Sequence, residues 1–227
     1  MANPVILPRD TLFDAGTRPA ITVSCADQDA VIRYTLDGSV VTDSSAVYSG
    51  PIEIIANTVL RAQAFLEGKH PSNQLLESYH FVDPARNGIR WKQFNRKVIK
   101  LPDLSALKPV ASGTAYRFSL TKINVPKHDF ILQMTSWIEI DKDGDYTFYI
   151  TSNDGSKLYI NDKLFVDNDG EHGAKEMSNT LHLSRGRHKM GVEYFNGGGG
   201  KVLSVSYSSA GIPYQPIPEY LLFTSKE

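Results

Sequence analysis

The segment Asp141-Lys142-Asp143-Gly144-Asp145 places carboxylates at alternate positions, as a calcium-binding loop begins. An EF-hand loop also requires glycine at its sixth position and glutamate at its twelfth. Tyr146 and Ser152 stand at those two positions, and strand-like sequence flanks the segment on both sides. The pattern therefore favours a tight hairpin turn over a calcium loop of this type.

A run of four glycines follows Asn196 and ends at Lys201, which partly matches a phosphate-binding loop. Such a loop requires Ser or Thr after the lysine, and a helix whose N-terminus holds the phosphate. Val202 follows Lys201 instead, and the sequence beyond it is typical of a strand. We therefore expect a mobile hairpin loop that lines a binding surface, and no phosphate site.

Residues 167–173 combine carboxylates with one histidine, as a hydrolase site would. A glycosidase needs two carboxyl groups held about 5–10 Å apart across its substrate. Asx residues and glycines also build long turns with no chemistry. The six histidines are scattered, and none has the spacing of a metal site. A structural turn is favoured, no catalytic residue is assigned, and an independent hydrolase acting through Asp167 ranks last among the hypotheses.

Composition excludes several classes of protein for this 227-residue chain. The 24 Lys and Arg residues nearly balance 25 Asp and Glu, and the net charge of -1 argues against a nucleic-acid partner. No run approaches the ~18 apolar residues of a membrane span. Cys25 is the single cysteine, so no internal disulfide is expected. Residues 1–4 lack the charged start and apolar run of a signal peptide.

Short alternating segments separated by turn residues predict strands throughout the chain. In the first part these segments are residues 30–36, 52–54, 59–65 and 75–82. In the second part the strongest pattern is 130–140, followed by 146–150, the hairpin 157–166, then 181–183, 188–195 and 202–207. Proline, glycine and polar residues cluster at 83–88 with no apolar partner. The predicted organisation is a β-sandwich at 1–83, a linker at 84–88 and a second sandwich at 89–227.

An ordered series of motifs carries a family resemblance in the second part. The motifs are residues 143–150 (DGDYTFYI), 152–160 (SNDGSKLYI), 166–170 (VDNDG) and 192–196 (VEYFN). The series resembles the protective-antigen N-terminal fragment domain, a β-sandwich of flocculins, adhesins and bacterial glycosidases. The first part, through residues 32–39 (IRYTLDGS), Tyr48, 50–52 (GPI) and 60–62 (LRA), resembles the chitobiase/β-hexosaminidase C-terminal domain. That resemblance implies a small immunoglobulin- or fibronectin-like accessory sandwich, so the expected fold class is all-β with two sandwiches.

The protective-antigen-type resemblance of the second part also implies a sugar site. In the sugar-binding flocculins two adjacent aspartates joined by a cis peptide hold calcium, which contacts sugar hydroxyls, and a later asparagine completes the site. Asn153-Asp154 stands at the pair, and Asn196 follows Tyr194-Phe195 where the later asparagine would lie. The resemblance thus assigns carbohydrate binding to Asn153, Asp154, Asn196, Gly197 and Gly198. Calcium, the one metal implied, would use Asp154 and Asn196, and losing one carboxylate should weaken it.

Together the two modules imply a non-catalytic accessory region of a secreted bacterial glycoside hydrolase that binds or presents carbohydrate. Its expected partners are carbohydrate and the parent catalytic domain, and its expected location is secreted, periplasmic or cell-surface. The alternative is a structural spacer that packs on the catalytic domain without a ligand of its own, favoured by the missing first aspartate. No organic cofactor is expected.

Overall fold

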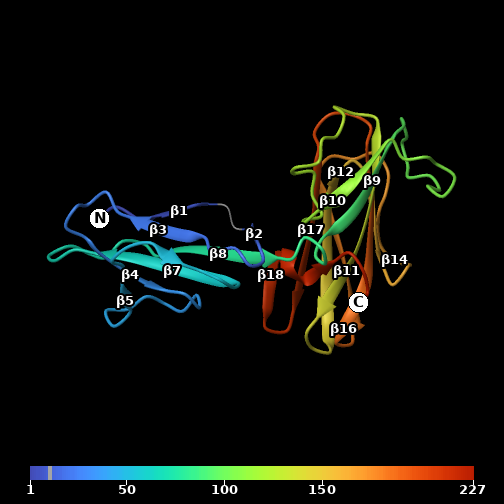
Figure 1. Ribbon diagram of the computed structural model, residues 1–227. Helices are drawn as coiled ribbons and strands as arrows, with labels where there is room; N and C mark the ends of the chain where they lie inside the picture. The colour runs from blue at the N-terminus through green and yellow to red at the C-terminus, as the bar shows by residue number, and fades with distance from the viewer. Residues whose placement is uncertain (10–11) are drawn as a thin grey trace. The chain divides into compact units, whose positions relative to one another are not determined.

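The computed structural model describes residues 1–9 and 12–227 and divides the chain into two units, Met1–Pro84 and Ala85–Glu227 (Figure 1). Both units are built from β-strands, and the all-β prediction is confirmed. The described residues include one helical segment, the short 3-10 turn η1 (Glu219–Leu221). None of the helical structure described is long and apolar enough to cross a membrane.

The first unit contains two sheets. The larger has the order β2 (Leu12–Asp14), β8 (Leu75–Val82), β7 (Thr58–Phe65), β4 (Val31–Thr35) and β5 (Ala46–Val47). The smaller has the order β1 (Val5–Leu7), β3 (Ala20–Ser24) and β6 (Ile52–Glu53). The β2–β8 pair is parallel, and the other strand pairs among the described residues of this unit are antiparallel.

Alternation along the strands forms the core of the first unit. On β7, Leu60, Ala62 and Ala64 are buried while the residues between them are partly exposed. The buried side chains share one cluster with Ile21 of β3 and Tyr79 of β8. A strand with one apolar face must bury that face against another layer, which is why a sandwich forms. Cys25, expected to be a buried thiol, is half-buried against this cluster.

The second unit also contains two sheets. The seven-stranded sheet has the order β10 (Ala111–Ala115), β9 (Ile89–Asn95), β11 (Phe130–Ile140), β16 (Gly186–Asn196), β13 (Ser156–Ile160) and β14 (Lys163–Asn168), with β19 (Leu222–Phe223) pairing β11. The four-stranded sheet has the order β15 (Lys175–Leu183), β12 (Gly144–Asn153), β17 (Val202–Ser209) and β18 (Ile212–Pro216).

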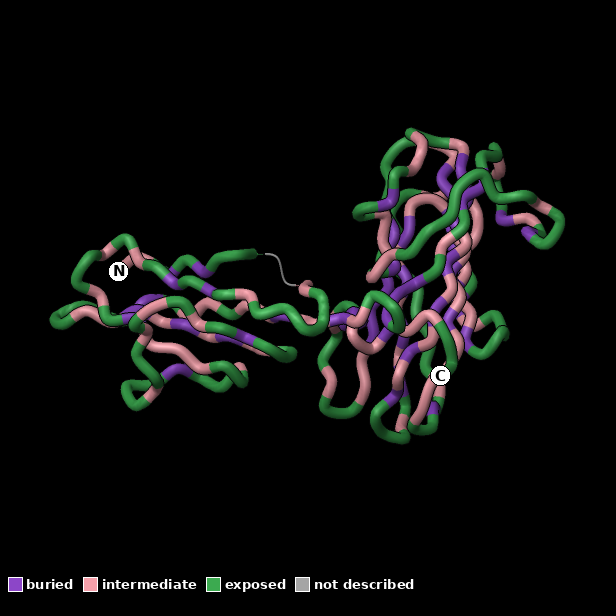
Figure 2. Tube along the Cα trace, viewed as in Figure 1, coloured by how far each residue is buried: buried purple, intermediate pink, exposed green. Residues whose placement is uncertain are grey.

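The core of the second unit lies between these two sheets. Leu132, Met134 and Ile138 of β11 and Phe148 and Ile150 of β12 are all 0% exposed and belong to one cluster. Buried positions follow the lengths of the strands, whereas the connections are mostly exposed (Figure 2). The period-two prediction for residues 130–140 is therefore confirmed, and one face of each central strand fills the sandwich.

Two predicted hairpin connections are wrong. β11 pairs with β9 and β16, whereas β12 pairs with β15 and β17, so residues 141–143 carry the chain from one sheet to the other. Residues 197–201 likewise join β16 to β17 across the two sheets. Each of these strands has one apolar face, and stacking the sheets buries those faces against each other, which pairing at their edges would not do.

Other segments agree with the sequence or extend it. β13 and β14 form the predicted antiparallel hairpin, whose turn residues Asn161 and Asp162 both have positive φ, as a tight hairpin turn requires. Residues 85–88 were expected in the linker but lie in the second unit, where the Asn87 side chain donates to the Leu222 carbonyl at 3.0 Å. Gly88 N–H donates to the same carbonyl at 2.9 Å.

Candidate functional site

Three connections between the sheets meet at one end of the second unit. They are residues 154–155 between β12 and β13, 169–174 between β14 and β15, and 197–201 between β16 and β17. Register brings them together, because Ser156 pairs with both Asn168 and Tyr194. The long connection 96–110 begins at the same end, since its neighbour Asn95 pairs with Phe130. We call these four connections the loop end (Figure 1).

The Asn153–Asp154 pair is tied to the end of β16 and to the glycine run. The peptide bond between the two residues is cis. Asp154 Oδ2 accepts a hydrogen bond from Gly197 N–H at 2.9 Å, and the Asn153 carbonyl accepts one from the Tyr194 hydroxyl at 2.5 Å. Burial raises the pKa of Tyr194 well above its usual range, and the nearby Asp154 carboxylate raises it further. The phenol therefore stays protonated and keeps donating to Asn153.

Asn196 lies beneath the glycine run and is 1% exposed. Its Nδ2 donates to the carbonyls of Gly200 at 2.9 Å and Gly198 at 3.2 Å, with a longer bond of 3.4 Å to the Asn153 carbonyl. Its Oδ1 is buried and has no hydrogen-bond partner among the described residues. A buried polar atom left unpaired costs about 1–3 kcal/mol, so this oxygen is hydrogen-bonding capacity left unused at the loop end.

The glycines of the run differ in their surroundings. A Cβ at Gly197 would lie 3.4 Å from the Val98 carbonyl oxygen, 3.7 Å from Glu171 Oε1 and 3.8 Å from Asp154 Oδ2. Three oxygen atoms from three connections therefore surround this glycine. A Cβ at Gly198 would meet nothing within 4 Å, so the backbone there is open to an approaching ligand.

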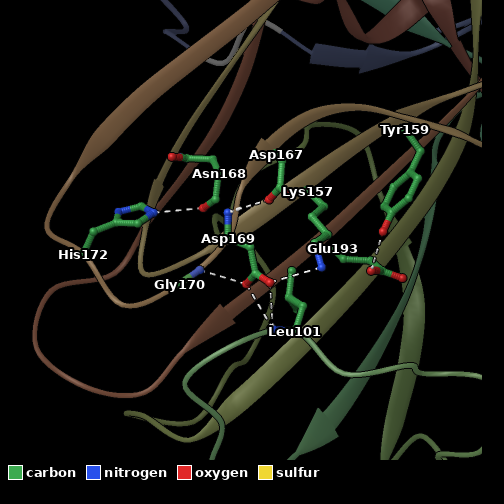
Figure 3. Close-up of polar contacts among 9 residues, drawn as sticks. All are labelled: Leu101, Lys157, Tyr159, Asp167, Asn168, Asp169, Gly170, His172 and Glu193. Atoms are coloured by element: carbon green, nitrogen blue, oxygen red, sulfur yellow. Dashed lines mark hydrogen bonds and ion pairs between the residues drawn. The ribbon is translucent and has the colours of Figure 1, made fainter.

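Asp169 joins two of the loop-end connections (Figure 3). Its carboxylate accepts hydrogen bonds from Leu101 N–H at 3.0 Å and from Gly170 N–H at 2.9 Å, and it pairs with Lys157 Nζ at 3.1 Å. The Asp169 and Lys157 side chains are only 12% and 19% exposed. Leu101 also packs in a small apolar cluster with Phe94, Leu104, Ile131 and Phe195. These contacts fix the 96–110 connection and thereby hold Val98 beside Gly197.

The acidic run 167–173 has the structural role that its sequence favoured. Asp167 Oδ1 accepts from Asp169 N–H at 3.1 Å, and the His172 ring bonds to the carbonyls of Asn168 at 2.9 Å and Gly173 at 2.7 Å. These bonds are local to the turn, and Figure 3 shows Asp169 directed toward Leu101 and Lys157. The hydrogen-bonding groups of this run are largely used in holding the loop in place.

Comparison with known families now places the second unit. Residues 87–220 match the model of the PA14 domain, which covers more than half of the chain. The chain belongs to the PA14 domain family. Residues 14–75, in the first unit, match the chitobiase/beta-hexosaminidase C-terminal domain. Neither matched model is a catalytic domain. No curated protein matches this sequence.

Solved structures share the fold of the PA14 unit. The PA14 domain of the MpAFP antifreeze protein is 17% identical and has a TM-score of 0.53, with 62% of this chain and 92% of that one covered. A PA14 sugar-binding domain from an RTX adhesin is 15% identical with a TM-score of 0.50, over 59% of this chain and 96% of that one. An anti-sigma factor domain-containing protein from Clostridium clariflavum is 15% identical with a TM-score of 0.52, over 86% and 80% of the two chains.

The loop end of the PA14 domain offers oxygen atoms, which suit a hard cation such as calcium. Asp154 contributes a carboxylate, Asn196 an unpaired amide oxygen, and Val98 a carbonyl oxygen. Glu171 brings a second carboxylate to the same glycine. No group of three or more His, Cys, Asp or Glu side chains that could hold a metal occurs in the described part of the chain. The donor set fits calcium only if amide and carbonyl oxygens supplement the two carboxylates.

The structure brings most of the predicted residues into contact. Asp154 meets Gly197, and Asn196 meets both Asn153 and Gly198. The sequence prediction did not include Glu171 or Val98. Glu171 had a signal, its place in the acidic run 167–173, but that run was treated only as a turn or a hydrolase site. Val98 contributes a backbone oxygen, for which its side chain gives no signal.

Proposed function

We propose that the PA14 domain binds carbohydrate at the loop end, through Asn153, Asp154, Asn196 and the backbone of Gly197 and Gly198. The observation that carries the proposal is the buried, unpaired Oδ1 of Asn196 next to a site with an Asp154 carboxylate. Carboxylates and amides suit sugars because their oxygen atoms accept hydrogen bonds from hydroxyl groups, and amide N–H groups donate to them. The open face of Gly198 lets a sugar ring approach the backbone.

Calcium is part of this proposal, with Asp154 and Asn196 as its side-chain ligands. When bound, calcium would supply positive charge and open coordination positions to sugar hydroxyls. Glu171 supports the proposal because it supplies the second carboxylate that Asn153 does not. Asp169 and Lys157 are positioning residues and not ligands. Asp169 bonds to Leu101 and pairs with Lys157, which holds the connection that contains Val98.

The wider setting is also proposed. The chain would be an accessory region, with a protective-antigen-type domain, of a secreted bacterial glycoside hydrolase, and the parent catalytic domain would be its covalent neighbour. The match of residues 14–75 to a chitobiase/beta-hexosaminidase C-terminal domain supports this setting. The near-balanced charge suits a neutral glycan. Export to the periplasm, the cell surface or the medium follows from the same setting.

The test is a glycan array followed by calorimetry, each with calcium and with EDTA. Binding that needs calcium is expected, together with at least a tenfold loss for Asp154→Asn, because hydrogen bonds to a charged group contribute about 1.5–3 kcal/mol. Glu171→Gln should weaken calcium binding as well. Asp143→Asn, in the connection at the opposite end of β11, is the matched control and should bind normally. No detectable binding to host or dietary glycans, either with calcium or with EDTA, would overturn the proposal.

A structural spacer is the second candidate, and Asn153 in place of an aspartate is the observation that favours it. Deleting residues 1–227 from the parent enzyme separates the two functions. Loss of activity only on polymeric substrates supports carbohydrate binding. Loss of folding, or of activity on short substrates as well, supports a structural role.

A further inference from the structure

The outer face of the seven-stranded sheet contains a hollow of about 480 Å³ where β10, β9 and β11 lie side by side. Met134 and Ile138 of β11 are buried in the core. Because successive side chains of a strand point to opposite faces, the odd-numbered residues next to them point outward. Register places outward-facing side chains from the three strands in two rows, each a set of directly paired residues. The rows are Thr114, Arg90 and Thr135, and Ser112, Lys92 and Gln133.

Two cations dominate this hollow. Arg90 and Lys92 are both exposed and lie two positions apart on β9, which puts them about 7 Å apart on one face. Within residues 1–9 and 12–227, no ion pair or hydrogen bond of either side chain is found, and no carboxylate lines the hollow. The rest of the lining consists of Trp91, Gly113, three hydroxyl side chains and one amide. The hollow therefore presents unpaired positive charge among groups that bond to hydroxyls.

Two adjoining hollows share residues with the first and differ from it in being lined by carboxylates as well as cations. One also contains Lys92 and Gln133 and is bordered by Asp103 and Glu193. The other contains Gln133 and Thr135 and is bordered by Tyr159 and Glu193. Lys189 also lines it, paired with Asp162 at 2.6 Å. Glu193 accepts hydrogen bonds from the Tyr159 hydroxyl at 3.1 Å and from Gln133 Nε2 at 3.3 Å, as Figure 3 shows for Tyr159. A ligand crossing this face meets the unpaired cations Arg90 and Lys92 at one end, and at the other the carboxylate of Glu193 together with the Lys189–Asp162 ion pair.

This polarity fits a sugar acid better than a neutral sugar or an acidic peptide. The guanidinium of Arg90 matches a carboxylate in two parallel hydrogen bonds. The hydroxyls of the sugar would donate to Glu193 and Asp103, where a peptide carboxylate would be repelled. We propose that the outer face of the seven-stranded sheet binds the uronate residues of an acidic oligosaccharide, with a carboxylate between Arg90 and Lys92.

The cation end of this site lies away from Asp154 and Asn196, although Asp103 belongs to the 96–110 connection of the loop end. Thr135 lies five residues along β11 from Phe130, which pairs with Asn196 at the loop end. At about 3.4 Å per residue the two places are about 17 Å apart along the strand. The proposal does not rest on the loop-end function, and calcium has no part in it.

Calorimetry of the full 227-residue chain in EDTA, with a galacturonate tetramer, tests the proposal. Wild-type protein should bind, and the double variant Arg90→Gln/Lys92→Gln should bind at least ~10-fold more weakly, as expected for the loss of charge-assisted hydrogen bonds. Raising the salt concentration from about 50 to 500 mM should weaken binding several-fold, because both cations are exposed. The matched control Lys142→Gln/Lys163→Gln removes the same charge elsewhere and should bind as wild type does. Asp154→Asn should also leave the affinity unchanged.

Several outcomes would overturn the proposal. These are no binding of the tetramer, equal affinity for its neutral carboxyl-reduced form, and wild-type affinity in the double variant. Equal or tighter binding of a polyaspartate peptide or a sulfated dextran would show attraction to any anion and would also reject uronate recognition. Thermal melting checks the fold of the double variant, and if it melts early the single variants Arg90→Gln and Lys92→Gln replace it. Each single variant should weaken binding about 3–5-fold, since each removes one of two cations.

Discussion

The two ends of the PA14 sandwich use similar residues in different ways. At one end, residues 141–143 connect the two sheets, and Asp141, Asp143 and Asp145 lie in or next to this connection. At the loop end three further connections join the sheets, and two of them contain Asp154 and Glu171. Asp143 Oδ1 accepts from Arg185 N–H at 2.6 Å, and Asp145 pairs with His182 at 3.0 Å. At the loop end, the buried Oδ1 of Asn196 has no partner among the described residues. The comparison teaches that the two ends differ in hydrogen-bonding capacity left unused, which Asn196 retains at the loop end, and not simply in the number of their acids.

The largest effect is expected where the loop-end connections touch through backbone atoms. A Cβ at Gly155 would lie 2.5 Å from Phe195 Cε1, 2.6 Å from Gly170 N and 2.8 Å from Gly170 O. Gly155→Ala should lower the free energy of unfolding by about 3 kcal/mol, the cost of forcing an atom into a packed region. Urea denaturation measures this change. Gly173→Ala is the control, because its Cβ would meet nothing within 4 Å. A Gly155→Ala variant as stable as wild type would mean that the connections do not pack this closely.

Asn196→Asp tests whether the loop end, in contrast to the opposite end, binds calcium at residue 196. The substitution replaces the Nδ2 that donates to the carbonyls of Gly198 and Gly200 with an acceptor. In EDTA the variant should lose about 2 kcal/mol of stability, since buried acceptors lose their donor. Calcium at about 100 times its Kd should restore roughly 2.7 kcal/mol by binding only the folded state. Thermal or urea unfolding with and without calcium measures both changes. Full stability in EDTA, or no response to calcium, would contradict a cation site here.

Tyr194→Phe tests the bond that holds Asn153 in place. Losing the hydroxyl should lower stability near neutral pH by about 1 kcal/mol. The folded-state pKa of Tyr194 is raised above the unfolded value of about 10, so its contribution is present below pH 10 and lost as pH rises further. The stability of wild type should therefore fall more steeply between pH 9 and 11 than that of the variant. Parallel slopes in urea unfolding across that range would show that this phenol ionises equally in both states.

Sequence patterns predicted strands well but not their partners. Residues 130–140 alternate strictly, and β11 spans the same range. Alternation shows that one face is buried, but it does not show which strand is hydrogen-bonded to which, so it cannot distinguish a hairpin from a crossing between sheets at the connection to β12. β15 was predicted only at 181–183 because residues 175–180 are all exposed and carry no alternation. β10 (Ala111–Ala115) was missed for the same reason.

For the candidate site, too, the sequence predicts the residues of a local motif but not their contacts with distant segments. Asp154, Asn196 and the glycines were found through a motif whose members lie close in the fold. Glu171 and Val98 lie near Gly197 in the fold, although they are 26 and 99 residues before it in the sequence. Their placement depends on Asp169 bonding to Leu101, a contact between distant segments that no local pattern encodes. The sequence could therefore propose the side chains of the site but not the loops that enclose it.

The smallest effect is expected at the opposite end, for Asp143→Asn. Asparagine keeps an oxygen that accepts from Arg185 N–H, so only the charge on an exposed hydrogen bond is lost, a change of roughly 0.5 kcal/mol. Melting temperature should shift little, and calcium should stabilise the variant and wild type equally. If calcium instead stabilised wild type but not Asp143→Asn, the ion would bind at the 141–145 turn. That result would reverse the comparison, because the end where Asp143 and Asp145 already have partners would then be the one that holds the cation.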